Sequence, residues 1–447
     1  MEDNWLFNRL NKFADQTAII WQDREYSYQE ISDGISGYFN ILKNHNINEG
    51  ECVALYGDFS PDITMLLLAL VQNHNIAVPL TSPVSSAMND CLKTARVTSL
   101  FEFENTDTYH LKKIDNNTGN HPLLEKLKQD HEAGLILFTS GSTGEMKAAL
   151  HSFPKILSKF EKKGRSFVSL AFLLLDHIGG INTLLYSLCN CGTIVVGVER
   201  SPDAVCHIIE QHKVDLLPTT PTFLRMLMIS EAYKKYDLSS LRLITYGTEP
   251  MPRATLKALV KIFPGVGLKQ TYGLTETGIL PTKSESSGSS GLKLGGDIKI
   301  VDGILHIRPE MIMLGYLNAQ APIDENGWYN TGDVVEITDN GYLRILGRES
   351  EIINVGGEKV FPGEIENIIC KMDNIKDVTV RGIPNPVTGN IVAATVELVE
   401  NESAETLEQR VREFCEKRLP PFKVPTIVES ASDRLYSGRF KKIRNFA

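Results

Sequence analysis

A hydroxyl-rich loop with two glycines and a lysine is the segment of the chain best suited to holding phosphate. It reads Thr139-Ser140-Gly141-Ser142-Thr143-Gly144-Glu145-Met146-Lys147 and directly follows the apolar run 135–138. Glycine lets the backbone approach an anion, hydroxyl groups donate hydrogen bonds, and lysine adds positive charge. The spacing differs from the GxxxxGK[ST] pattern of a P-loop, which weakens a kinase or ATPase interpretation. An ordinary Ser/Gly turn is the alternative.

The elements that must position this loop are predicted from alternating apolar runs and helical periods. A capping box is expected at Ser27 and Glu30, and Pro252 is placed to open a helix. Such alternation predicts parallel sheets covered by helices. Strands are expected at 18–21, 53–56, 77–80, 135–138, 193–198 and 241–246, and helices at 63–72 and 204–212.

From about residue 280 the apolar period changes to two. Hairpins are expected around Asp302-Gly303 and Asp339-Asn340-Gly341, so a small β-rich unit is predicted. The Ser/Gly run 284–291 is interpreted as a flexible linker or a mobile loop over a site. Helices near Pro362 and at 404–417, with strands at 378–380 and 392–398, predict a small α+β domain at the C-terminal end.

Composition sets outer limits on the class of protein. The chain has 447 residues, with 46 Lys plus Arg against 55 Asp plus Glu. This length predicts two or three domains, and the acidic balance argues against a nucleic-acid partner. The apolar runs 65–71 and 167–175 are shorter than the roughly 20 residues of a membrane-spanning helix. Seven scattered cysteines and no secretory pattern predict a soluble, cytoplasmic protein with reduced thiols and no membrane span.

The phosphate loop resembles the signature of the adenylate-forming superfamily, which includes acyl-CoA synthetases, peptide-synthetase adenylation domains and luciferases. Four further stretches follow in the order of that family. The resemblance extends from about residue 15 to the C-terminus. The stretches are Gly-Thr-Glu-Pro at 247–250, Gln-Thr-Tyr-Gly-Leu-Thr-Glu-Thr at 270–277, Tyr-Asn-Thr-Gly-Asp at 329–333, and Gly-Arg at 347–348 leading into 353–360.

The resemblance implies the roles of the phosphate-binding residues. Adenylation joins a carboxylate to the α-phosphate of ATP and expels pyrophosphate, so electrostatic stabilisation dominates. In the family pattern Thr275 bonds the α-phosphate and Glu276 ligates Mg²⁺, a hard cation that prefers oxygen ligands. The β- and γ-phosphates are held by the loop residues Thr139, Ser140, Gly141, Ser142, Thr143, Gly144 and Lys147.

The same resemblance implies a nucleoside site. Asp333 has the acceptor-only carboxylate that takes both ribose hydroxyls, and Arg348 lies on the same sugar. Tyr272 offers a flat face to the adenine. The backbone of Gly247, Thr248 and Glu249 reads the adenine edge.

The acid-binding side is expected at residues 174–181. His177 fits the family position beside the substrate carboxylate, with glycines that open the acyl pocket. Asp176 lies one position before the place where amino-acid-activating members carry an aspartate, and a local cap or hydrogen bond is the alternative for it. A carboxylic acid is therefore favoured over an amino acid as substrate.

The C-terminal lysine departs from the family pattern. Family members carry Gly-Lys-x-x-Arg, whereas here Gly438 is followed by Arg439, and Lys441 lies three residues before Arg444. Lys441 is favoured for the adenylation role because a compact point charge must fit between two oxygens. Arg439 is the second candidate, and a solvated basic tail is the alternative. The pair Lys442-Ile443 imitates the family's Lys-Ile pair.

The predicted protein is an α/β, AMP-forming acid–thiol ligase. Residues 1–347 form a large multi-layer ATP- and acid-binding domain with parallel sheets and a small β-rich unit. Residues 348–447 are expected to form a small α+β lid. The family resemblance implies that this lid swings about a hinge near Ser350 and that Gly356-Gly357 then lines a pantetheine tunnel. ATP, Mg²⁺ and coenzyme A, or the phosphopantetheine of a carrier protein, are the expected cofactors, with a small-molecule carboxylic acid as substrate.

Three alternatives are kept beside this prediction. The first is a stand-alone ligase that loads an acyl or peptidyl carrier protein. The second is a catalytically weakened nucleotide-binding protein. The third is a phosphotransferase, which only the phosphate loop supports.

Overall fold

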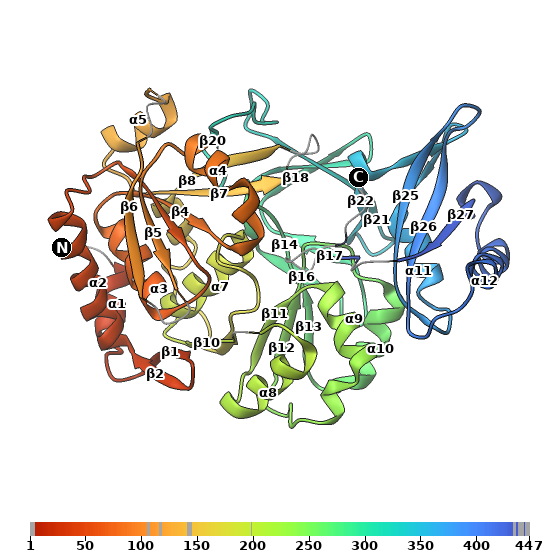
Figure 1. Ribbon diagram of the computed structural model, residues 1–447, viewed down its shortest axis with the longest axis horizontal. Helices are drawn as coiled ribbons and strands as arrows, with labels where there is room; N and C mark the ends of the chain where they lie inside the picture. The colour runs from red at the N-terminus through yellow and green to blue at the C-terminus, as the bar shows by residue number, and fades with distance from the viewer. Residues whose placement is uncertain are drawn as a thin grey trace.

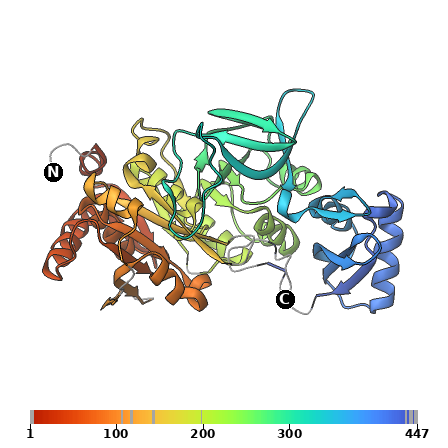
Figure 2. The same ribbon diagram turned by 90° about the horizontal axis from the view of Figure 1, so that it is seen from above.

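The computed structural model describes residues 5–104, 108–115, 119–140, 145–197, 199–431, 435, 436 and 442, except the side chain of Ser140. A larger N-terminal part contains three sheets and a short hairpin, and a smaller C-terminal part lies at one end of it (Figures 1 and 2).

The first sheet of the N-terminal part is almost entirely parallel. Its order is β13-β12-β11-β9-β10-β1-β2, and β1–β2 is its one antiparallel pair. Apolar strands such as Thr193–Val196 are expected where helices cover both faces of a sheet. The strands are β1 Thr17–Trp21, β2 Arg24–Ser27, β9 Val168–Leu170, β10 Thr193–Val196, β11 Leu216–Thr219, β12 Leu243–Tyr246 and β13 Gly267–Gln270.

The second sheet has a parallel centre with antiparallel edges. Its order is β20-β8-β7-β4-β3-β5-β6, and β3, β4, β5 and β7 run parallel. Strands β7 and β8 flank the phosphate loop. The strands are β3 Cys52–Tyr56, β4 Ile76–Leu80, β5 Val97–Phe103, β6 Tyr109–Lys113, β7 Gly134–Ser140, β8 Met146–Ser152 and β20 Gly315–Tyr316.

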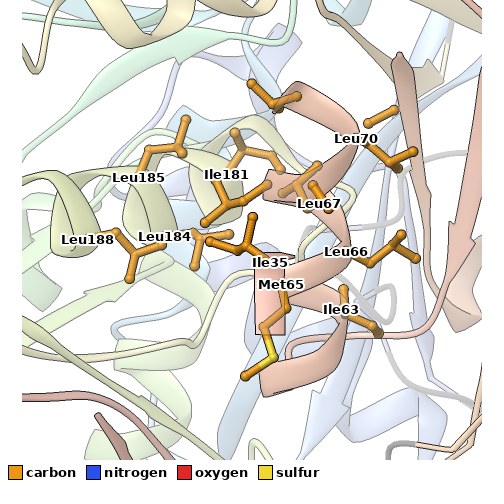
Figure 3. Packing of buried hydrophobic residues seen from close by; sticks show 14 of the residues in the cluster. Ile35, Ile63, Met65, Leu66, Leu67, Leu70, Ile181, Leu184, Leu185 and Leu188 are labelled. Atoms are coloured by element: carbon orange, nitrogen blue, oxygen red, sulfur yellow. The ribbon is translucent and has the colours of Figure 1, made fainter. Parts of the chain in front are cut away.

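Helices pack between and around these two sheets. Ser27 caps α2 and forms the predicted capping box with Glu30. Apolar side chains of α3, including Leu67, face Leu184 and others on α7 (Figure 3). They belong to a buried cluster that contains residues of both sheets. The helices are α1 Trp5–Asn11, α2 Tyr28–Asn44, α3 Pro61–Gln72, α4 Met88–Thr94, α5 Pro122–Gln129, α6 Phe153–Ser158, α7 Ile178–Cys189, α8 Pro202–His212, α9 Pro221–Ser230 and α10 Arg253–Ile262, with 3-10 turns η1 Ser82–Ala87 and η2 Ala232–Lys234.

The predicted β-rich unit is a six-stranded antiparallel sheet in the order β16-β17-β22-β21-β19-β18, preceded by the hairpin β14–β15. The turn Asp302-Gly303 joins β18 and β19 with positive φ at both residues, as a type I′ turn requires. The strands are β14 Tyr272–Leu274, β15 Gly278–Leu280, β16 Thr282–Ser284, β17 Leu292–Leu294, β18 Asp297–Val301, β19 Ile304–Arg308, β21 Tyr329–Ile337 and β22 Leu343–Arg348.

The Ser/Gly run 284–291 is a hairpin connection within one sheet and not a linker, while its alternative interpretation as a mobile loop over a site stays a prediction. It joins the antiparallel strands β16 and β17. The hydroxyls of Ser284 and Ser287 accept hydrogen bonds from the backbone N–H groups of Gln270 (3.0 Å) and Leu268 (3.3 Å) on β13. Small polar residues suit a linker and a tight turn equally, and the sequence alone does not show these long-range contacts.

The C-terminal part is an α+β unit with its own apolar core, which includes Val360, Ile365 and Val411. Its sheet has the order β24-β23-β26-β25, with β27 beside β26. Strand β22 ends at Arg348 and β23 begins at Ile353, while the division between residues 347 and 348 stays a prediction. The elements are η3 Glu349–Glu351, β23 Ile353–Val355, β24 Glu358–Val360, α11 Pro362–Ile369, β25 Ile375–Asn385, β26 Gly389–Leu398, α12 Ala404–Glu416, η4 Pro421–Lys423 and β27 Ile427–Ser430.

This architecture confirms the predicted fold class of parallel sheets, a β-rich unit and a small α+β C-terminal part. Within the described ranges, no helix has the length and apolar character needed to cross a membrane.

Candidate active site

Three predicted site segments follow strands of the first sheet. Residues 247–249 come directly after β12, residues 271–276 after its neighbour β13, and His177 follows β9. The carboxyl ends of parallel strands share one edge of a sheet, which is where ligands bind in open α/β folds. The fold therefore gathers these segments, although they are far apart in the sequence.

Asp333, Arg348 and Tyr272 form one hydrogen-bonded group. Asp333 on β21 lies opposite Arg348 on β22, and Arg348 Nε is 2.7 Å from Asp333 Oδ1. The Tyr272 hydroxyl donates to Asp333 Oδ2 at 2.6 Å. Burial raises the pKa of Asp333, and the Arg348 guanidinium and the Tyr272 hydroxyl oppose that rise. The structure thus brings together the three residues expected around a nucleoside.

Glu276 lies in the turn of the β14–β15 hairpin, at residues 275–277. Gly278 closes the turn at φ +65°, a conformation that favours glycine. The Glu276 carboxylate is buried, and its Oε1 accepts a hydrogen bond from the Tyr316 hydroxyl at 2.5 Å. The charge of Glu276 also contributes to the raised pKa of Asp333, so the two carboxylates lie in one electrostatic environment.

The surroundings of Glu276 fit a magnesium ion. Among the described residues, Oε1 has the Tyr316 hydroxyl as partner, and no hydrogen bond reaches Oε2. The described part of the chain holds no cluster of three or more His, Cys, Asp or Glu side chains suited to a metal. Magnesium at nucleotide sites is commonly held by one or two carboxylates together with phosphate oxygens, so a single carboxylate suffices.

The stem of the phosphate loop lies beside this carboxylate. Thr139 on β7 pairs with Lys147 on β8, and Lys147 Nζ is 5.5 Å from the centre of the Tyr316 ring. Tyr316 therefore contacts both Lys147 and Glu276. The loop residues Gly141, Ser142, Thr143 and Gly144, and the side chain of Ser140, lie outside the described part of the chain.

The segment Gly247–Glu249 has a constrained backbone. A Cβ on Gly247 would lie 2.6 Å from Thr271 Oγ1 and 2.9 Å from Thr271 O, so only glycine fits there. Thr248 has φ +73°, a strained value for a β-branched residue and one that clusters at functional sites. The Glu249 carboxylate accepts a hydrogen bond from Thr222 N at the start of α9, at 2.8 Å. The Glu249 side chain thus fixes this segment to α9.

His177 is the N-cap residue of α7. Its Nδ1 accepts a hydrogen bond from Gly179 N at 3.0 Å, which places the proton of the neutral ring on Nε2. Asp176 beside it is buried. The contact of His177 with a substrate carboxylate stays a prediction, because the hydrogen bond establishes only its cap role.

Of the C-terminal basic residues considered for the adenylation role, the structure describes only Lys442. Arg439 and Lys441 lie outside the described ranges. Lys442 Nζ lies 3.2 Å from Glu366 Oε2 and 3.3 Å from Asp377 Oδ1, and it donates to Val378 O at 2.8 Å. Lys442 is thus engaged in a buried cluster of the C-terminal part.

Two long-range contacts were not predicted from the sequence, one in the site and one between the N-terminal and C-terminal parts. Tyr316 and Glu276 are separated by 40 residues, and Arg225 and Asp377 by 152. The apolar periodicity of a sequence predicts helices and strands. It does not predict which residues of different elements come into contact, so neither pair could be predicted from it. Tyr316 could have been recognised as a site residue only if the pairing of its strand with β8 had been known.

The fold and these contacts define a two-part nucleotide-binding enzyme. The chain belongs to the AMP-binding enzyme family, which it matches over residues 6–317, and it matches the AMP-binding enzyme C-terminal domain over residues 364–439. The predicted adenylate-forming superfamily is thereby confirmed, and the relatives reported next are named CoA ligases, in agreement with the predicted class of AMP-forming acid–thiol ligase.

Similar proteins of known activity match along almost the full length. The chain is 27% identical to a 2-succinylbenzoate–CoA ligase of Bacillus pumilus, with 98% of each sequence covered. It is 27% identical to an indoleacetate–CoA ligase of Aromatoleum aromaticum, with 94% of this chain and 92% of that protein covered.

Two solved structures have the same fold. The anthranilate CoA ligase AuaEII with anthranoyl-AMP has a TM-score of 0.84 at 21% identity, covering 98% of this chain and 95% of that one. The o-succinylbenzoate CoA synthetase of Bacillus subtilis with its acyl-adenylate has a TM-score of 0.81 at 22% identity, covering 99% and 97%.

Proposed function

We propose that this protein activates an aromatic carboxylic acid with ATP and transfers the acyl group to coenzyme A. A carboxylate oxygen attacks the α-phosphorus of ATP and pyrophosphate leaves, giving an acyl-adenylate. The thiol of coenzyme A then attacks the acyl carbon, and AMP leaves with the electron pair of the broken C–O bond. The observation that carries this proposal is the convergence of Asp333, Tyr272, Arg348 and Glu276 in one electrostatic environment.

Different residues of the chain bind the nucleotide, the magnesium ion and the phosphates. Asp333 is oriented by Arg348 and Tyr272 and accepts the ribose hydroxyls, which fixes the nucleotide. Magnesium, when bound, neutralises charge on the departing pyrophosphate, and Glu276 is the residue that would hold it. Lys147 adds a positive charge beside the phosphate loop. Thr275 precedes Glu276 in the same turn and is assigned to the α-phosphate.

An aromatic acid is the substrate class that the relatives support. The names of the similar proteins specify 2-succinylbenzoate, indoleacetate and anthranilate, all of which carry an aromatic ring. His177, which follows β9, is assigned to the acid-binding side.

We assign the adenylation lysine to Lys441, with Arg439 as the second candidate. Lys442 is held by Glu366 and Asp377, which supports its exclusion from this role. Single-turnover formation of acyl-adenylate would fall by about 10² or more in Lys441→Ala. A comparable loss in Arg439→Ala, with Lys441→Ala active, would transfer the assignment to Arg439.

The substrate and the acceptor are tested by AMP release over a panel of acids. Matched aromatic and aliphatic carboxylic acids are offered with Mg-ATP and either coenzyme A or a pantetheinylated carrier protein. We expect thioester formation on coenzyme A with aromatic acids. Thioester formed only on the carrier protein would assign the alternative acceptor, and preference for aliphatic acids would overturn the aromatic assignment.

A further inference from the structure

Tyr316 lies between two groups that the proposed function uses. Its hydroxyl donates to Glu276 Oε1 at 2.5 Å, and its ring lies 5.5 Å from Lys147 Nζ. Glu276 comes from the β14–β15 hairpin, whereas Lys147 comes from β8 immediately after the phosphate loop. Tyr316 is thus the contact that connects the carboxylate assigned to magnesium with the stem of the phosphate loop.

The segment around Tyr316 is held tightly along β8. Strand β20 pairs antiparallel with β8, with Tyr316 opposite Ala149. Backbone bonds on each side extend this pairing, from Leu314 N to Leu150 O at 2.7 Å and from Leu317 N to Ala148 O at 2.9 Å. The Tyr316 side chain is buried, so its position is set by the edge strand that carries it.

Asn318 continues the pairing beyond the strand itself. Its Oδ1 accepts from Ala148 N at 3.0 Å, and its Nδ2 donates to Met146 O at 2.8 Å. A side-chain amide therefore replaces backbone pairing at the point where the chain leaves the phosphate loop. Tyr316 and Asn318 are thus both held against β8, which forms the stem of the phosphate loop.

We propose that Tyr316 is a positioning residue that holds the Glu276 carboxylate and the Lys147 ammonium in one fixed geometry toward a magnesium-bound triphosphate. The proposal rests on the proposed function, which assigns magnesium to Glu276.

The hydrogen bond determines how Glu276 meets a cation. A charge-assisted bond to Oε1 restricts the orientation of the carboxylate and, among the described residues, leaves Oε2 without a hydrogen bond. Residues that orient a metal ligand commonly affect metal affinity or activity by 10- to 100-fold when removed, since a freely rotating carboxylate must be ordered on binding. The Tyr316 ring in addition attracts the Lys147 ammonium through its negative face.

Tyr316→Phe removes the hydroxyl and keeps the ring. Tyr28→Phe is the matched control, because the buried Tyr28 hydroxyl donates to Gly192 O at 2.7 Å, away from the site. In Tyr316→Phe we expect the Mg²⁺ concentration for half-maximal acid-dependent pyrophosphate exchange to rise by about tenfold, with the KM for the acid unchanged. Tyr28→Phe should keep the Mg²⁺ dependence of the unmodified protein.

A second readout does not require activity. ATP binding is measured by calorimetry with Mg²⁺ and with EDTA. The gain in ATP affinity on adding Mg²⁺ should fall by about tenfold in Tyr316→Phe, while binding in EDTA stays unchanged. In a Glu276→Gln background, Tyr316→Phe should have no further effect on that gain, because the negative charge that would hold the magnesium ion is already removed.

The outcomes separate this inference from the proposed function. Unchanged Mg²⁺ dependence of ATP binding in Tyr316→Phe would overturn the positioning role, as would an equal shift in Tyr28→Phe. If the unmodified protein showed no pyrophosphate exchange, the proposed reaction would be overturned. If Tyr316→Phe nevertheless weakened the Mg²⁺-dependent binding of ATP, the positioning role would be supported.

Discussion

Arg225 on α9 and Asp377 on β25 form an ion pair of 2.8 Å that joins the N-terminal part to the C-terminal part, and each side chain is 11% exposed. Arg225 also donates to Lys376 O at 2.8 Å. Lys442 approaches the same carboxylate, and its second partner is Glu366. The positive charges of Lys442 and Arg225 hold the pKa of Asp377 below its usual value, although burial opposes this. A buried cluster of two cations and two carboxylates thus lies at the boundary.

Removing one cation of this cluster should destabilise the fold. Arg225→Met leaves Asp377 with one positive partner fewer in a buried place, and we expect a loss of about 3 kcal/mol in the free energy of unfolding. Arg308→Met is the control, because Arg308 and Asp297 form an exposed pair on β19 and β18. Urea unfolding of both variants measures the difference. Equal stability of the two variants would show that the boundary cluster contributes nothing.

His151 should make the fold sensitive to acid. It is buried on β8, and burial lowers its pKa from 6.5 to about 4, although the Thr275 backbone opposes this shift. Because the unfolded chain binds the proton more readily, this contribution to stability is complete above pH 6.5 and is lost as pH falls toward 4. Between pH 7 and 5 the loss should be about 2 kcal/mol.

Comparing urea unfolding at the two pH values in His151→Leu and in the unmodified protein isolates this effect. The variant should lose less stability on acidification. His110→Leu is the control, because the His110 side chain is 68% exposed. If His151→Leu and the unmodified protein lost equal stability, the buried imidazole would not be the titrating group.

Asp333→Asn should weaken nucleotide binding. The amide places a hydrogen-bond donor where two ribose hydroxyls need an acceptor, and it removes the charge that pairs with Arg348. We expect the KM for ATP to rise by about 10- to 100-fold, with little change in the KM for the acid. Steady-state kinetics measure both constants, and Asp297→Asn on the same sheet is the control. A selective rise in the KM for the acid would contradict the ribose assignment.

Glu276→Gln should separate catalysis from folding. The substitution preserves the shape of the side chain and removes the charge that would hold magnesium, so adenylation should slow by about 10² or more. The Tyr316 hydroxyl can still donate to the amide oxygen, so the urea midpoint should change little. Pyrophosphate exchange and urea unfolding are measured on the same preparation. A fall in stability that accounts for the whole loss of activity would indicate a structural role.

Local chemistry made part of the fold predictable. The capping box of Ser27 and Glu30 and the turn Asp302-Gly303 each depend on a few neighbouring residues, and both formed as expected. The linker interpretation of the run 284–291 was wrong because Ser284 and Ser287 accept hydrogen bonds from β13, and such long-range contacts are not visible in the sequence.

In the site, too, local contacts could be predicted from the sequence and long-range contacts could not. Asp333 and Arg348 lie opposite each other across the β21–β22 hairpin, so their association follows from local pairing. The bond between Tyr316 and Glu276 depends on how two sheets and a hairpin come together. No spacing in the sequence encodes that tertiary arrangement, and only the assembled fold reveals it.

The exchange of labelled pyrophosphate into ATP by the purified full chain tests the central claim most directly, because exchange that depends on a carboxylic acid reports the reversible formation of an acyl-adenylate. The account predicts exchange that requires both Mg²⁺ and an aromatic carboxylic acid, and that stops when EDTA is added. Release of ADP, or no exchange with any acid of a broad panel, would contradict it.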